Sequence, residues 1–165
     1  MKIVYIIRHA KSDWSIEGQG DIDRPLNARG YKDAHNMGLY FKKKNFIPQA
    51  IISSPAIRAL TTALIISEKL LFPKNRVQIE ASLYESGIDE YLDVLKSLPE
   101  EVGSVGIFGH NPIVSDLSSS LSGQAIEMPT CAVARFSLEG DKWNSLSRES
   151  IKFLEMITPK TINLT

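Results

Sequence analysis

Short apolar runs and longer amphipathic segments alternate along this chain from end to end. The runs near the start and middle hold mostly valine, isoleucine and other apolar residues, which is typical of parallel strands buried on both faces. The two runs nearest the C-terminus alternate or are β-branched, and the first of these can run antiparallel at an edge of the sheet. Six segments predict strands, at residues 2–7, 50–53, 77–80, 105–108, 133–138 and 151–157.

Helical periodicity fills the intervals between these strands. After Asn27, a residue type that caps helices, apolar residues recur at a spacing of three or four up to Phe41. Ser54-Pro55 predicts another helix start, with the serine as cap and the proline in the first turn of a long apolar-faced helix. Two further helices are predicted, at residues 89–98 and from Asn111-Pro112 onward.

This alternation of strands and helices predicts an α/β fold. We expect a three-layer α/β/α arrangement, in which a mostly parallel central sheet is covered by helices on both faces. The chain has 165 residues, of which 43% are hydrophobic and 23% charged, so it can bury a substantial core. No internal repeat, low-complexity tract or linker composition interrupts it, and we therefore expect a single domain over residues 1–165.

Charge and cysteine content exclude several classes of protein. Lysine plus arginine and aspartate plus glutamate both number 19, a balance that argues against a broad nucleic-acid-binding surface. The lone Cys131 excludes an intramolecular disulfide, and no metal-ligand spacing is found. The first apolar run is too short for a signal peptide, and none approaches the ~20 apolar residues of a membrane span. We expect a cytoplasmic protein that does not enter a membrane.

Charged and imidazole side chains directly follow three of the predicted strands. Arg8-His9 ends the first strand, Arg58 lies in the first turn of the helix after the second, and His110 follows the fourth. Ligands of open α/β sheets bind outside the carboxyl ends of the strands, so we expect these side chains to meet there. An arginine in a first helical turn opposes the helix dipole, a conflict expected mainly at functional sites. The combination suits a phosphate group.

Four phrases at these junctions resemble the histidine phosphatase superfamily, the phosphoglycerate mutase-like enzymes. They occur in the order expected of that family, as Arg8-His9-Ala10-Lys11-Ser12, Ser53-Ser54-Pro55-Ala56-Ile57-Arg58-Ala59-Leu60-Thr61-Thr62-Ala63, Leu83-Tyr84-Glu85 and Gly109-His110-Asn111-Pro112. A fifth phrase and the short chain are most similar to the SixA-like phosphohistidine phosphatase branch, and this phrase is Asp23-Arg24-Pro25-Leu26-Asn27-Ala28-Arg29-Gly30. The resemblance extends over residues 2–138 and implies a phosphoglycerate mutase-like fold.

The resemblance implies a covalent phosphohistidine mechanism. His9 would attack phosphorus and carry the phosphoryl group until water removes it, with the other ring nitrogen of His9 donating to a backbone carbonyl. Arg8, Arg58 and His110 would hold the phosphoryl oxygens and stabilise the charge during transfer. Glu85 matches the family's proton donor to the leaving group. The resemblance implies no metal and no other cofactor.

Other residues near these phrases have less defined roles. Asp21 and Asp23 compete with Glu85 as proton donors, and Trp14 is either a packing residue or a contact for substrate at the rim. Further phosphate contacts are expected from Ser12, Ser15 and Asn111.

Two departures from the mutases bear on the substrate. Ala10 stands where the mutases carry glycine, so either its φ is negative or the turn differs. Residues 71–103 leave little room for the mutases' insertion over the site, and an open site suits a protein that bears phosphohistidine. A small phosphomonoester is the alternative substrate, and a non-catalytic phosphate-binding module is a third possibility. No apolar heptad pattern predicts self-association, so we expect a monomer.

Overall fold

A mixed six-stranded sheet forms the centre of the protein. The computed structural model describes residues 1–165 in full, and the strand order is β3-β2-β4-β1-β5-β6. The pairs β1–β4, β2–β4 and β2–β3 are parallel, whereas β5 pairs antiparallel with both β1 and β6. The strands are β1 (Lys2–Arg8), β2 (Ala50–Ser53), β3 (Gln78–Ile79), β4 (Ser104–Gly109), β5 (Val133–Leu138) and β6 (Ile151–Ile157). The predicted α/β class is confirmed.

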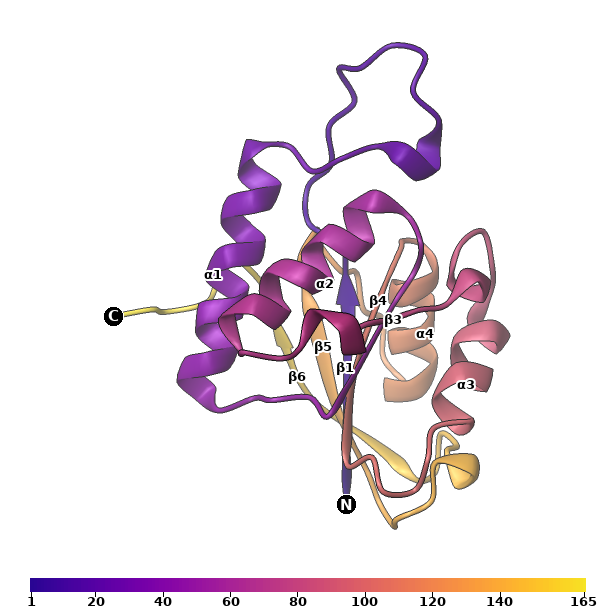
Figure 1. Cartoon of the computed structure of the whole chain (residues 1–165). Helices are drawn as coiled ribbons and strands as arrows, with labels where there is room; N and C mark the ends of the chain where they lie inside the picture. The colour runs from indigo at the N-terminus through magenta and orange to yellow at the C-terminus, as the bar shows by residue number, and fades with distance from the viewer.

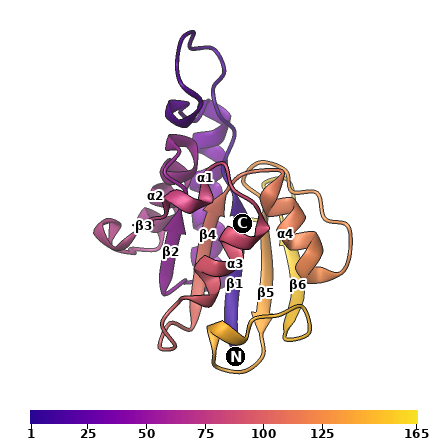
Figure 2. The ribbon, with the colours of Figure 1, turned by 90° about the vertical axis from the view of Figure 1, so that its right-hand side faces the viewer.

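Four helices cover the two faces of this sheet. They are α1 (Ala28–Lys44), α2 (Ile57–Lys69), α3 (Ile88–Lys96) and α4 (Ile113–Ser122). Helices α1 and α2 lie on one face and α3 and α4 on the other, as Figures 1 and 2 show. The three-layer arrangement agrees with the prediction.

Strand β1 explains why the first apolar run has no polar alternation. Val4 and Ile6 belong to the apolar cluster that contains the buried side chains of α3 and α4, whereas Tyr5 and Ile7 belong to the cluster that contains those of α1 and α2. Alternate side chains of one strand point to opposite faces, and here each face carries a core. A strand in this position is therefore apolar at nearly every residue.

The expected edge position of the fifth strand is wrong. Strand β5 is antiparallel, as anticipated, but it lies between β1 and β6, and β6 forms the edge. The burial of the two strands is consistent with this order. Strand β5 is buried at five of its six positions, whereas β6 is buried only at its first and last residues.

Two helix starts differ from their prediction, and one agrees. The side chain of Asn27 accepts a hydrogen bond from the backbone N–H of Gly30 at 2.8 Å, as expected of a cap. Helix α2 begins at Ile57, two residues after the predicted start, and α4 begins after Pro112. The side chains of Ser54 and Asn111 make other contacts in the site instead.

The parallel strands β1, β2 and β4 all end on the same side of the sheet. This side is the carboxyl edge, which Figure 1 shows at the arrowhead of β1. The loop of residues 11–27 stands out beyond this edge. Its base is closed by a bridge between Ser12 and Leu26, and Gly30 packs against it so closely that a Cβ would lie 2.1 Å from the carbonyl oxygen of Lys11. None of the helices combines the length and the apolar composition that crossing a bilayer requires.

Candidate active site

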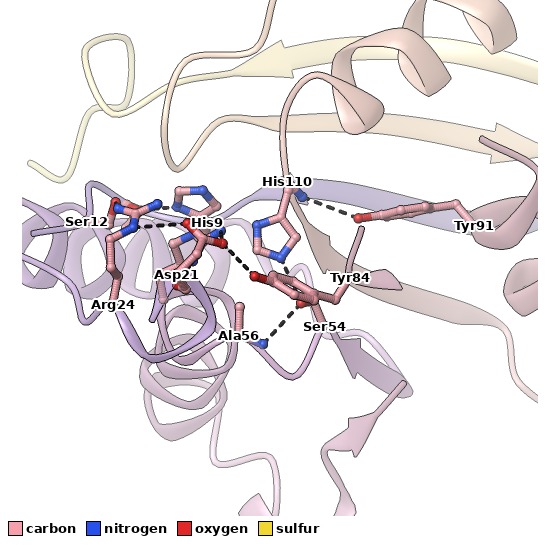
Figure 3. Close-up of polar contacts among 11 residues, drawn as sticks. His9, Ser12, Asp21, Arg24, Ser54, Ala56, Tyr84, Tyr91 and His110 are labelled. Carbon is pink, nitrogen blue, oxygen red and sulfur yellow. Dashed lines mark hydrogen bonds and ion pairs between the residues drawn. The ribbon is translucent and has the colours of Figure 1, made fainter. Parts of the chain in front are cut away.

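A polar cavity of about 300 Å³ lies at this edge, and we call it the His9 cavity. Figure 3 shows the rings of His9 and His110 beside each other, and their centroids are 5.3 Å apart. Eight residues singled out from the sequence line the cavity, namely Arg8, His9, Ser12, Trp14, Asp21, Arg58, His110 and Asn111. The other lining residues are Lys11, Arg24 and Thr130.

The ring of His9 is buried and held by a carbonyl. Its Nδ1 lies 2.7 Å from the carbonyl oxygen of Ala10. Because a carbonyl only accepts, Nδ1 carries the proton and Nε2 keeps its lone pair. Burial lowers the pKa of His9 to about 3, so the ring is neutral at physiological pH. A neutral imidazole with one fixed tautomer is suited to nucleophilic attack through Nε2.

Ala10 fits the turn after β1 without strain. It is not among the non-glycine residues with positive φ, so the backbone here does not need the glycine that the mutases carry. Its N–H donates to the hydroxyl of Thr62 at 3.0 Å, and that hydroxyl donates to the carbonyl of Arg58 at 2.7 Å. The residue after His9 is thereby tied to the first turn of α2.

His110 is positioned by the hydroxyl groups of two residues from different segments. Its Nε2 lies 2.7 Å from the hydroxyl oxygen of Ser54, and its backbone N–H donates to the hydroxyl of Tyr91 at 3.3 Å. A Cβ on the preceding Gly109 would lie 2.0 Å from that Tyr91 oxygen, so only glycine allows this approach. Burial, and then the nearby Arg58 cation, lower the pKa of His110 to about 4.

The two arginines keep buried donors without partners. Arg8 donates to the carbonyl of Met128 at 3.0 Å, and Arg58 makes two contacts with Asp21. The Nε atoms of both arginines and Nδ1 of His110 are nevertheless buried with no hydrogen-bond partner. Unsatisfied buried polar atoms are rare in folded proteins. The three residues that carry these atoms line one cavity, and two of them are arginines, a combination suited to an anionic ligand.

Asp21 is the centre of a polar network that the sequence did not reveal. Its carboxylate accepts from Tyr84 at 2.6 Å, from Arg58 at 3.0 Å and from Arg24 at 3.2 Å. The hydrogen bond from Tyr84 contributes most to lowering the pKa of Asp21, to about 2. Asp21 is therefore ionised at neutral pH and is unsuited to donate a proton. Asp23 is exposed and does not line the cavity.

Glu85 lies outside the His9 cavity. It lines an adjoining cavity of about 250 Å³, which we call the Glu85 cavity. The side chain is exposed, and its backbone φ of 54° is left-handed. Four residues line both cavities, namely Asp21, Arg58, His110 and Asn111. The expected nucleophile and the expected proton donor thus occupy neighbouring compartments.

The remaining predicted contacts divide between the cavity and the surface. Ser12 is buried and accepts a hydrogen bond from the Arg24 guanidinium, whereas Ser15 is exposed and does not line the cavity. Ser15 thus lies apart from the cavity, on the part of the loop beyond the bridge at Ser12. Asn111 lines the cavity, but its amide already donates to the carbonyl of Met128 at 3.0 Å.

Sequence reasoning gave no site role to Ser54, Arg24 or Tyr84. Arg24 is buried, and its guanidinium carbon lies 3.4 Å from the ring centroid of Trp14, which is itself 73% exposed at the rim. Each of the three lies within a phrase that resembles the family, and that position is the signal that could have found it. No group of three or more His, Cys, Asp or Glu side chains converges as a metal site would require.

Comparison with known proteins agrees with this geometry. Residues 4–103 match the model of the histidine phosphatase superfamily, branch 1. The chain belongs to this superfamily. An uncharacterized chloroplastic protein of Arabidopsis thaliana is 29% identical over 146 residues, which are 84% of this chain and 67% of that protein. An uncharacterized phosphatase of Bacillus subtilis, PhoE, is 41% identical over 75 residues, but these are 44% of this chain and only 38% of that phosphatase.

Among the solved structures that share this fold are SixA proteins. The protein histidine phosphatase SixA in complex with tungstate superposes with a TM-score of 0.82 at 23% identity, over 96% of this chain and 97% of that one. A mycobacterial glucosyl-3-phosphoglycerate phosphatase superposes with a TM-score of 0.66 at 18% identity, over 96% and 98%. The expected phosphoglycerate mutase-like fold is confirmed, and so is the phosphatase class of enzyme at the level of the family.

Proposed function

We propose that this histidine phosphatase hydrolyses phosphohistidine on a protein through a covalent intermediate on His9. The observation that carries the proposal is the state of the His9 ring. Its Nδ1 is bound to the carbonyl of Ala10 and its pKa is held near 3, so that a neutral Nε2 is available in a cavity with two arginines. This arrangement supports attack on phosphorus by a single, fixed nitrogen.

The proposed reaction has two displacements at phosphorus. In the first, the Nε2 lone pair of His9 forms a bond to phosphorus while the bond from phosphorus to the substrate nitrogen breaks, and its electron pair returns to the leaving imidazole. In the second, water attacks phosphorus and the bond to Nε2 breaks, which restores neutral His9 and releases inorganic phosphate. Arg8, Arg58 and His110 surround the group that carries the charge, and their role is to bind its oxygens.

Two features support a protein as the bearer of the phosphoryl group. The expected proton donor, Glu85, lies in a separate cavity, and an imidazole that is already protonated on its distal nitrogen leaves with little help from an acid. In addition, the loop of residues 11–27 carries three exposed apolar side chains beside the site, namely Trp14, Ile16 and Ile22. Exposed aromatic and aliphatic groups at the rim suit contact with a protein surface.

A small phosphomonoester is the second candidate. The observation that favours it is the presence of Glu85 itself, because an alkoxide leaving group needs a proton. The glucosyl-3-phosphoglycerate phosphatase among the structural neighbours acts, by its name, on an ester of this kind.

Steady-state kinetics with matched substrates separates these candidates. Three substrates are compared by kcat/KM. The first is a folded protein whose histidine has been phosphorylated by phosphoramidate, and the other two are glycerol 2-phosphate and p-nitrophenyl phosphate. We expect the phosphohistidine protein to be preferred over glycerol 2-phosphate, and His9→Ala to abolish turnover of all three. His35→Ala, which removes an exposed histidine of α1, is the control and should have no effect. Preference for glycerol 2-phosphate would reject phosphohistidine as the substrate class, and phosphate binding without turnover would leave only a binding module.

A further inference from the structure

The His9 cavity and the Glu85 cavity share a wall. Asp21, Arg58 and His110 line both cavities, whereas His9 lines only one of them and Tyr84 and Glu85 only the other. A proton donor must come within hydrogen-bond distance, directly or through one water, of the atom that it protonates. Whatever fixes this wall therefore controls whether Glu85 reaches a leaving group at His9.

The hydrogen bond between Tyr84 and Asp21 joins this shared wall to the segment that carries Glu85. The Tyr84 hydroxyl donates to the Asp21 carboxylate at 2.6 Å, and Figure 3 shows this contact spanning the space below His110. The Tyr84 ring stands edge-on to the His110 ring, with centroids 5.7 Å apart. The segment that carries Glu85 is thus tied, through the residue before it, to the loop that carries Asp21.

Asp21 is itself firmly held on the other side of this bond. The backbone carbonyl of Asp21 accepts from Arg58 at 2.7 Å, and its carboxylate accepts from Arg58 at 3.0 Å and from Arg24 at 3.2 Å. Arg58 and Arg24 are both buried, so these anchors do not move freely. Tyr84 is therefore bound to a carboxylate that two buried arginines already hold.

The bond persists across the physiological pH range. Its partners keep the pKa of Asp21 at about 2, and the carboxylate raises the pKa of Tyr84 to about 12. Donor and acceptor are consequently a neutral phenol and an ionised carboxylate throughout this range, the combination in which a hydrogen bond is short and strong. A change of pH within the physiological range therefore does not break the Tyr84–Asp21 hydrogen bond.

The consequence for chemistry depends on the leaving group. When the bond from phosphorus to an alkyl oxygen breaks, the electron pair goes to an alkoxide, which has to take a proton from an acid such as the Glu85 carboxyl. When the bond from phosphorus to an imidazole nitrogen breaks, the electron pair goes to a ring that already holds its proton on the distal nitrogen and leaves neutral. Only the first reaction needs Glu85.

We propose that the Tyr84–Asp21 hydrogen bond is a specificity determinant that separates Glu85 from the phosphoryl group on His9 and so favours leaving groups that depart without a proton. Tyr84 is then a positioning residue that acts through the placement of Glu85. The proposal rests on the proposed function, because it explains why phosphohistidine would be preferred to an alkyl phosphate at the same nucleophile.

Tyr84→Phe tests this directly, because it keeps the ring against His110 and removes only the hydroxyl. We expect kcat/KM for glycerol 2-phosphate to rise roughly tenfold, a part of the ~10²–10⁴ that a well-placed general acid supplies. Among aryl phosphates, the dependence of rate on leaving-group pKa should become shallower. Turnover of a histidine-phosphorylated protein should not rise with it. Thermal unfolding of the same sample shows that the variant is folded.

Two further variants make the outcome decisive. Adding Glu85→Gln to Tyr84→Phe should abolish the gain on glycerol 2-phosphate. Tyr31→Phe, which removes the hydroxyl of a half-exposed tyrosine on α1, should alter neither reaction. Absence of a gain in Tyr84→Phe, or a gain that survives Glu85→Gln, overturns the proposal. These results are separate from the fate of the proposed function, which fails if the wild-type protein does not dephosphorylate the histidine-phosphorylated protein at all.

Discussion

Arg58 and Asp21 are joined by two hydrogen bonds, one from each terminal nitrogen of the guanidinium, at 2.7 Å to the backbone carbonyl and 3.0 Å to the carboxylate. The first residue comes from helix α2 and the second from the loop of residues 11–27. An anion bound at Arg58 therefore shares the cation with a negative charge that the protein supplies. If the cavity binds phosphate as proposed, Asp21 competes with that anion for Arg58.

Asp21→Asn is expected to tighten the binding of inorganic phosphate. Removing one negative charge beside the bound anion is worth about 1 kcal/mol at the effective dielectric of a partly exposed site, or roughly a fivefold lower Kd. Isothermal titration calorimetry measures this change. Asp23→Asn removes a carboxylate from the same loop but outside the cavity, and it should leave the Kd unchanged. Weaker binding in Asp21→Asn would show that Asp21 orients Arg58 for the anion and does not compete with it.

Ser54→Ala is expected to impair turnover more than stability. The alanine removes the contact of 2.7 Å to Nε2 of His110 and the hydrogen bond to the backbone of Ala56. Loss of one such hydrogen bond costs about 1 kcal/mol of the free energy of unfolding, whereas a mispositioned His110 should lower kcat roughly tenfold. Denaturant unfolding and steady-state kinetics give both values.

Ser53→Ala is the matched control for this prediction. Ser53 is the neighbouring buried serine, and its hydroxyl donates to the carbonyl of Ser54 without reaching the cavity. It should lose a similar amount of stability and keep its turnover. Equal kcat in the two variants would mean that Ser54 has no part in placing His110.

The two site histidines are expected to stay neutral well below pH 6. Burial holds the pKa of His9 at about 3 and that of His110 at about 4, against about 6.5 for both in the unfolded chain. Between these values the unfolded chain binds protons that the folded protein does not. The free energy of unfolding should therefore fall as the pH is lowered from about 6.5 towards 4. Above about pH 6.5 both rings are neutral in the folded and the unfolded chain, so neither changes this free energy with pH.

Nuclear magnetic resonance of the imidazole protons checks this directly. The signals of His9 and His110 should show no titration step between pH 8 and 5 in the free protein. A step near the ordinary histidine pKa, assigned through His9→Ala or His110→Ala, would contradict the buried neutral state that the nucleophile needs.

Gly109→Ala is expected to disturb the fold and the site together. The new Cβ would lie 2.0 Å from the Tyr91 hydroxyl, so the end of β4 or helix α3 has to shift, at a cost of about 1–3 kcal/mol. Because His110 is the next residue, activity should fall as well. Gly106→Ala, in the same strand, meets nothing closer than 3.5 Å and should be tolerated, as thermal unfolding would show.

The sequence was most informative where the signal is local. Arg8 and His9 directly follow a run that is apolar on both faces, so their place at the carboxyl edge follows from the strand alone. Arg58 and His110 are likewise tied to strand-to-helix junctions. The covering of both sheet faces follows from the same pattern, because β1 needs apolar side chains for two cores.

What the sequence did not predict depends on contacts between segments that are distant along the chain. Ser12 lines the cavity beside its bridge to Leu26 and Ser15 does not, and no local pattern predicts that pairing. Nor does any local pattern predict the hydrogen bond between Tyr84 and Asp21, which are 63 residues apart. The edge position of β6 depends on which strand pairs with β5, and alternation alone does not specify a partner.

The proposed mechanism requires a bond between Nε2 of His9 and phosphorus during turnover. The wild-type protein is mixed with a ³²P-labelled histidine-phosphorylated protein, and the reaction is quenched rapidly without acid. Mass spectrometry then locates the label. We expect a transient phosphoryl group on His9 that is stable to alkali and labile to acid, and that is absent in His9→Ala. Release of phosphate at an undiminished rate by His9→Ala, or a label on any other residue, would contradict it.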